Sequence, residues 1–190
     1  MRFEEAIEKL NAYKTSGIDA DMTAFFTELE FATLDVEQWP DSFVTGLSEL
    51  LGDNDFHRLP DSWKLLHFLN NNWEQLAGKQ RSALREILAT SFDSYSDSMG
   101  AFVTAEILGE HYCDKATLDV FARLAKEAAA PANAFVPHGL EVFANTTPQT
   151  TLRELAITQL RLLSRSASGS LGREATDALR RLQRTTTSQH

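Results

Sequence analysis

The chain has 190 residues, and its 27 Asp and Glu against 18 Lys and Arg give a formal net charge of −9. Apolar residues make up 43% and charged residues 24%, so a chain of this length can bury its own core and is not disordered throughout. A surface this acidic repels nucleic-acid phosphates and anionic lipid, so we expect neither as a partner and favour a basic protein instead.

The negative charge lies mainly in the first third of the sequence. Residues 1–62 carry 14 acids and 4 bases, residues 63–150 have a net charge of −3, and residues 151–190 have a net charge of +4. Solvated helix faces would explain the acidic segment, and so would a docking surface for a basic protein.

The first three elements are expected from apolar spacing in residues 3–13, 22–29 and 43–51. In the third, Phe43, Val44, Leu47 and Leu51 follow the periodicity of an amphipathic helix. Gly52 then stands where a left-handed helix cap is common. A fourth helix is expected from about Asp61 to Asn70, because the asparagines that follow favour turns.

Six further helices are expected in the rest of the chain, and strand signals are nearly absent. Their apolar faces cover residues 78–92, 102–108, 118–128, 140–143, 152–163 and 175–182. The segment Ser168–Gly172 is interpreted as a flexible connector before the last helix. We expect a single all-α domain over residues 1–184, with about nine to ten helices, and a polar tail over 185–190.

Short internal echoes suggest how the helices are arranged. Trp39-Pro40-Asp41-Ser42-Phe43 is followed twenty residues later by Leu59-Pro60-Asp61-Ser62-Trp63. Leu118-x-x-Phe121-Ala122 is echoed by Leu152-x-x-Leu155-Ala156 at an offset of 34. Such offsets are typical of antiparallel hairpins stacked as a solenoid, whereas chance matches would leave a compact irregular bundle; both remain open.

Residues 73–163 resemble degenerate HEAT-type helical repeats. The resemblance is carried by Leu84-Arg85-Glu86-Ile87-Leu88, by Leu118 to Leu124 and by Leu152-Arg153-Glu154-Leu155-Ala156. It implies an irregular, right-handed HEAT-like array. The repeat lengths vary, and the usual proline and arginine are out of register. By size, charge and helical class alone, the chain is also similar to bacterial immunity proteins, which neutralise a cognate toxin by binding it.

Residues that could perform chemistry are sparse. No phosphate-binding glycine loop and no helical zinc-protease motif occurs. Glu106, His111 and His138 could share a metal if the fold brought them together, which is the basis of a less favoured metal-enzyme alternative. Acids flank Cys113, which disfavours a reactive thiolate. We therefore expect no enzyme activity, no cofactor and no resident metal.

The compartment is expected from the cysteine content and the N-terminal residues. Cys113 is the single cysteine, so an intrachain disulfide is impossible and a reducing compartment fits best. The first residues lack the apolar stretch of a signal peptide, and no apolar run approaches the length of about 18 residues that a membrane span needs. We expect a cytoplasmic protein.

The predicted function is protein binding. Trp39 and Phe56 fall at element ends, where aromatic rings plug the seams between helices or, when exposed, act as interface anchors. Both lie among acids. The predicted contact residues for a basic partner are Asp35, Glu37, Trp39, Asp41, Asp53, Asp55 and Phe56. The favoured form is an immunity-type inhibitor whose acids occlude the basic cleft of a toxin, and the alternative is an adaptor or assembly factor.

Overall fold

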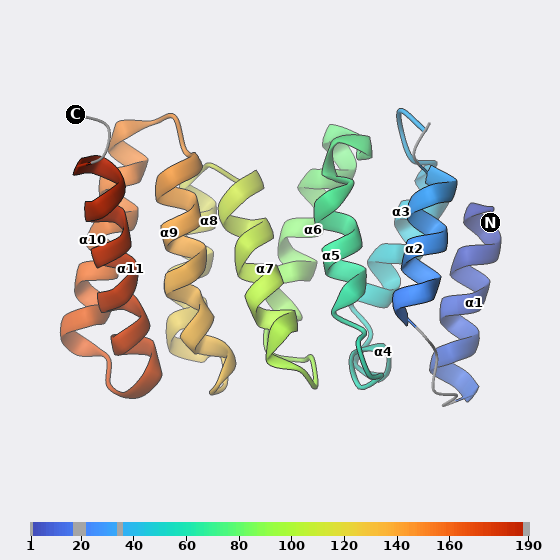
Figure 1. Cartoon of the computed structure of the whole chain (residues 1–190), viewed down its shortest axis with the longest axis horizontal. Coiled ribbons are helices and arrows are strands. Elements are labelled where there is room, and N and C mark those ends of the chain that lie inside the picture. Colours follow the sequence, from blue (N-terminus) through green and yellow to red (C-terminus); the bar gives the residue numbers. More distant parts are fainter. Residues whose placement is uncertain (1, 17–21, 34–35, 188–190) are drawn as a thin grey trace. The chain divides into compact units, whose positions relative to one another are not determined.

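The protein was analysed as a computed structural model that describes residues 2–16, 22–33 and 36–187. Over these residues the chain forms eleven α-helices and two short 3₁₀ segments, with no strand, which confirms the all-α prediction (Figure 1). No described helix is both long and apolar enough to span a membrane. The elements are α1 (Phe3–Ser16), α2 (Met22–Thr33), α3 (Asp41–Leu51), α4 (Asn54–His57), α5 (Lys64–Asn71), η1 (Trp73–Gln75), α6 (Gly78–Thr90), α7 (Ser98–His111), α8 (Lys115–Glu127), η2 (Ala132–Phe135), α9 (Val136–Thr146), α10 (Thr150–Ser166) and α11 (Gly169–Thr187).

The chain divides into two compact units, Met1–Gly100 and Ala101–His190, where we expected one domain over 1–184. The units differ sharply in charge. The first contains 18 acids and 8 bases, a net of −10, and the second contains 9 acids and 10 bases, a net of +1. The acidity seen in the sequence therefore belongs to one structural unit.

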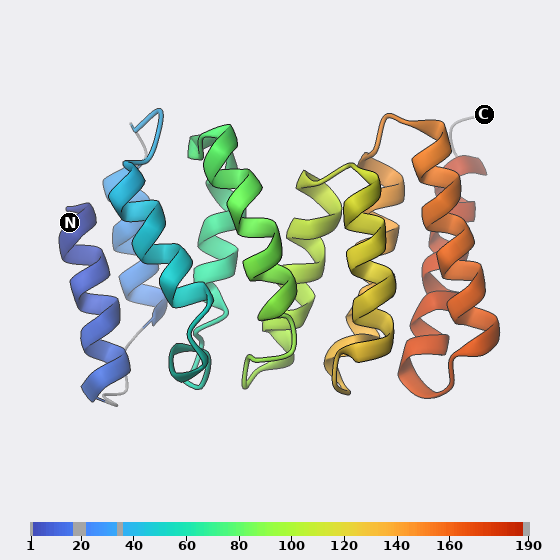
Figure 2. The ribbon, with the colours of Figure 1, turned by 180° about the vertical axis from the view of Figure 1, so that it is seen from behind.

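The first unit has two layers of helices. Helices α1, α3 and α6 pack in succession, and α2 packs on α5 (Figures 1 and 2). Six consecutive ring contacts, with centroids 4.6–5.9 Å apart, run through the core between the layers. Such pairs add about 0.5–1.5 kcal/mol each beyond the burial of their surface. The rings in order are Phe3, Phe43, Trp39, Phe68, Phe26, Phe25 and Tyr13.

The second unit is built by α8 to α11 and most of α7. Helix α10 packs on α8, α9 and α11, and α11 also packs on α9. Two glycines let α7 and α9 approach closely: a Cβ on Gly109 would lie 2.3 Å from the Gly139 carbonyl oxygen, and one on Gly139 would lie 2.8 Å from the Ala105 carbonyl oxygen. Larger residues at either position would push the two helices apart.

Three local predictions in the first unit need correction. Gly52 is not left-handed: its φ is −94° and its N–H donates to the carbonyl of Ser48. The left-handed residue is Asp61, with φ 58°, and the next helix begins after it at Lys64. Helix α4 was not predicted; Asp53 caps it by accepting from two backbone N–H groups. Because the chain turns directly into α4, Gly52 stays right-handed.

The connector expected at Ser168–Gly172 is also shorter than predicted. Helix α10 ends at Ser166 and α11 begins at Gly169, whose φ of +70° makes the turn between them. At the other end, α11 extends to Thr187, beyond the expected domain limit at 184. The rest of the predicted tail, residues 188–190, lies outside the described part of the chain.

Candidate protein-binding surface

The two aromatic residues proposed as partner contacts are buried. Trp39 is 1% exposed and Phe56 is 0% exposed, so neither is available as an interface anchor. The indole of Trp39 stacks on Phe68 at 5.2 Å and meets the edge of Phe43 at 5.2 Å. The acidic residues beside them in the sequence do not keep these rings at the surface. Burying a large aromatic ring stabilises the fold, and the neighbouring acids can remain in water while the ring is buried. The ring of Trp39 fills the seam between α3 and α5, which was the other interpretation, and Phe56 is buried.

Two of the proposed acids hold the first unit together. Asp41, at the start of α3, accepts hydrogen bonds from Lys79 Nζ at 2.6 Å and Gln80 Nε2 at 2.7 Å on α6. Asp53 accepts from Lys14 Nζ at 2.7 Å on α1. These hydrogen bonds hold the pKa of each carboxyl below its ordinary value, and the positive charge of the lysine adds a smaller effect in the same direction. Asp41 and Asp53 therefore already have cationic partners within the chain.

The two other described acids lie apart from each other. Glu37 and Asp55 are exposed, but Glu37 precedes α3 whereas Asp55 follows it. Eleven helical residues separate the two ends of α3 by about 16 Å at a rise of about 1.5 Å per residue. Asp55 also pairs with Arg58 at 3.1 Å. Asp35 lies outside the described residues.

An exposed aromatic residue on α2 escaped the sequence analysis. Phe31 is 73% exposed, the highest value among the exposed large hydrophobic residues of the described chain. At about 100° per residue it lies about 180° around the helix from buried Met22. Thr27 and Glu28 lie beside it on the exposed side of α2. The periodicity that placed Met22 inside therefore also predicts Phe31 outside.

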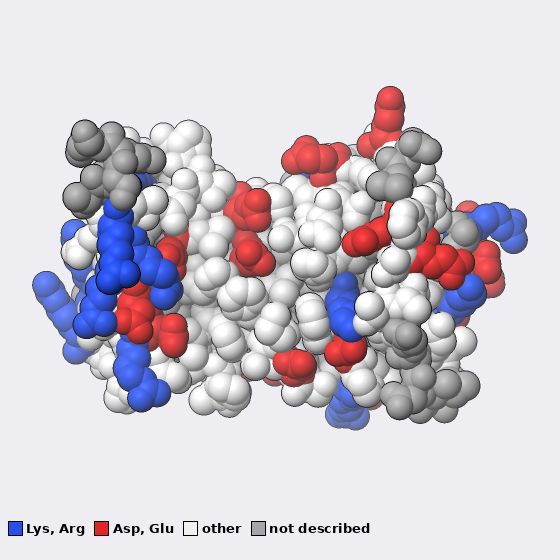
Figure 3. Space-filling model, viewed as in Figure 1, with Lys and Arg blue, Asp and Glu red and all other residues white. Residues whose placement is uncertain are grey.

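The charges of the surface follow the two units. Asp and Glu are spread over helices of the first unit, whereas Lys and Arg gather over α10 and α11, at the left of the view in Figure 3. Glu28 on α2 and Glu37 just beyond it are exposed, and neither has an ion pair with a described residue. Phe31 and Glu28 together are called the α2 surface below.

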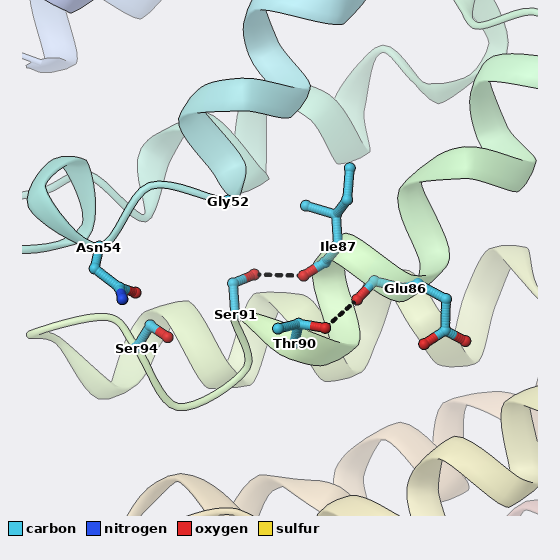
Figure 4. A pocket seen from close by; sticks show the side chains of 7 residues that line it. All are labelled: Gly52, Asn54, Glu86, Ile87, Thr90, Ser91 and Ser94. Atoms are coloured by element: carbon cyan, nitrogen blue, oxygen red, sulfur yellow. Dashed lines mark hydrogen bonds between the residues drawn. The ribbon is translucent and has the colours of Figure 1, made fainter.

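A hollow of about 370 Å³ in the first unit is a candidate small-molecule site (Figure 4). The hydroxyl groups of Thr90 and Ser91 donate to carbonyls of their own helix, at 2.7 and 2.9 Å, and are not directed at a ligand. The hollow is lined by Gly52, Asn54, Glu86, Ile87, Thr90, Ser91 and Ser94.

The structure gives no support to a metal site at Glu106, His111 and His138. The described residues contain no group of three His, Cys, Asp or Glu side chains placed to hold a metal ion. The ring of His138 instead stacks on Phe102, with centroids 4.4 Å apart, and burial lowers its pKa. Burial, reinforced by the negative charge of Asp114, raises the pKa of the Cys113 thiol, which disfavours its nucleophilic form.

Comparison of the chain with protein-family models, with curated proteins and with solved structures gave no match. The geometry and charge of the described residues are therefore the basis of any functional proposal.

Proposed function

We propose that the protein is a non-catalytic binding module whose first unit receives a basic partner protein. The observation that carries the proposal is Phe31, a large aromatic side chain 73% exposed on a unit with a net charge of −10. Leaving a phenyl ring in water is unfavourable, and aromatic side chains are enriched at the core of protein interfaces. On this proposal Phe31 enters a pocket of the partner.

The acids of the first unit would act mainly on the rate and selectivity of association. A net charge of −10 attracts a basic surface over a distance set by the ionic strength and repels acidic competitors. Glu28 lies beside Phe31 on the exposed side of α2, so it would form part of the polar rim of the contact. Asp41 and Asp53 are left out of this rim because they support the fold.

The concrete form that we favour is an immunity-type inhibitor. The α2 surface would cover the basic cleft of a toxin and exclude its substrate, and no reaction by this chain would be needed. An inhibitor of this kind forms one tight binary complex. The alternative is an adaptor or assembly factor, which would bind several proteins through the same surface.

The test is affinity capture from the source lysate at low and high salt, with matched variants. We expect one basic protein, released by salt and lost with Phe31→Ala, because truncating an aromatic anchor weakens binding by about 30-fold or more. Glu28→Lys should slow association and reduce its dependence on salt. Glu127→Lys, the same charge change at an exposed position on α8, is the control and should bind like the unaltered chain.

Two results would refute the proposal. One is a partner whose binding is the same for Phe31→Ala, Glu28→Lys and the control, because the α2 surface would then not be used. The other is an acidic partner whose binding is strengthened by Glu28→Lys. Both substitutions are on the exposed face of α2, so the far-ultraviolet circular dichroism should be unchanged and loss of fold would not explain loss of binding.

A further inference from the structure

The outward face of α10 carries a stripe of exposed residues, two of them leucines, with the spacing of a helix-pairing surface. Its five exposed residues are separated by four, three, four and three positions, and the two leucines are 42% and 59% exposed. An average spacing of 3.5 residues is the repeat with which one helix packs along another. The stripe consists of Thr151, Leu155, Thr158, Leu162 and Arg165.

The stripe is distinct from the face that α10 uses inside its own unit. Leu152, Ala156 and Leu160 are buried and face the interior of the second unit, where α8, α9 and α11 pack. The helix thus has a buried apolar face, which the described chain covers, and an exposed stripe whose apolar residues are Leu155 and Leu162.

Opposite charges lie along one edge of the stripe. Glu154 directly precedes Leu155, and Arg161 directly precedes Leu162, so each leucine has a charged neighbour in the same relative position. Both charged side chains are exposed, and neither forms an ion pair with a described residue; hydrogen bonds from Thr158 and Ser164 reach only their backbone carbonyls. The edge therefore has a negative half and a positive half.

We propose that the occupant of this stripe is α10 of a second copy of the chain, packed antiparallel about a two-fold axis near Thr158. An antiparallel partner places leucine against leucine and brings Glu154 opposite Arg161 of the partner subunit, twice in each dimer. The face is thus complementary to itself, as a two-fold interface requires. The stripe is about 21 Å long at a rise of about 1.5 Å per residue. Such a contact buries less than the roughly 800 Å² per partner of a standard interface and belongs to the transient class.

Charge reversal tests the pairing directly, by sedimentation equilibrium up to about 1 mM, the weak end of specific affinities. We expect a monomer–dimer equilibrium that Glu154→Lys or Arg161→Glu weakens about tenfold, because two attractive contacts become repulsive in each dimer. The double variant E154K/R161E should restore dimerisation. An equimolar mixture of the two single variants should form a heterodimer in which both contacts are attractive again. Glu127→Lys is the control and should behave as the unaltered chain.

A monomer throughout this concentration range would overturn the proposal, as would a double variant no better than the single ones. The second result would point to another occupant, such as an acidic helix of a different protein. Binding of such a helix would be weakened by Arg161→Glu and would not be restored when Glu154→Lys is added. Leu162→Glu gives an independent check, because a charge placed at the centre of the contact should abolish the dimer. All four positions are exposed, so the fold should survive each change.

Discussion

Replacing Gly109 by alanine tests how closely α7 and α9 pack. The added Cβ would lie 2.3 Å from the carbonyl oxygen of Gly139 and 3.0 Å from the backbone nitrogen of Phe143. Both atoms belong to the backbone of α9, so no side-chain rotation can relieve the overlap. Ordinary contact begins at 3.4 Å, and the helices would have to separate by about 1 Å.

Two opposing terms set the expected size of the effect. Forcing extra volume into a packed interface costs about 1–3 kcal/mol, and the rigid backbone contact places Gly109→Ala near the upper value. Alanine in place of glycine inside a helix returns about 0.5–1 kcal/mol. The net loss in the free energy of unfolding is therefore about 2 kcal/mol, which lowers Tm by about 4–8 °C in a chain of this size.

Urea unfolding followed by circular dichroism measures this loss, and Gly78→Ala is the matched control. A Cβ on Gly78 meets nothing within 4 Å, so that variant should gain up to about 1 kcal/mol from the reduced freedom of the unfolded chain. If Gly109→Ala were as stable as the Gly78 variant, the close approach of α7 and α9 would be refuted.

Two further predictions concern the charges of the fold. Asp53→Ala should lower the free energy of unfolding by about 1–2 kcal/mol, since it removes the cap of α4 and the ion pair with Lys14. Asp53→Asn keeps the cap and should lose less than half of that; equal losses in a urea titration would contradict the capping role. Burial lowers the pKa of His57 and His138 in the folded chain. In the unfolded chain a histidine has a pKa of about 6.5, so below that pH the unfolded chain binds more protons than the folded chain does. The free energy of unfolding should therefore be highest above about pH 7 and should fall by up to about 1.4 kcal/mol per pH unit for each histidine below pH 6.5. Equal urea midpoints at pH 5.5 and 7.5 would contradict this prediction.

The helices were predictable because their signals are local. Apolar spacing places Phe43, Leu47 and Leu51 on one face whatever the rest of the chain does, and the structure has α3 there. The wrong predictions at Gly52 and α4 also concern local structure, where two helix-capping signals compete. Asp53 caps a short helix directly after Gly52, so α3 does not end in a left-handed residue.

The candidate surface was predicted poorly because neighbours in sequence were taken as neighbours in space. Trp39 stands among acids in the chain but among aromatic rings in the fold. Phe31, in contrast, was available from periodicity alone, since it lies opposite Met22 on α2. Phe31 lies in the last turn of α2, and its exposure follows from its position around the helix.

The all-α class, most of the helices and the acidity of the first third could be predicted from the sequence, because periodicity and charge are properties of short segments. Which acids remain available to a partner depends on the way the helices pack. Asp41 is paired with Lys79, and Asp53 with Lys14, each across some forty residues of chain, whereas Glu28 has no ion pair among the described residues. Such pairings depend on how the helices pack, and packing is a sum of many weak contacts that no local pattern contains.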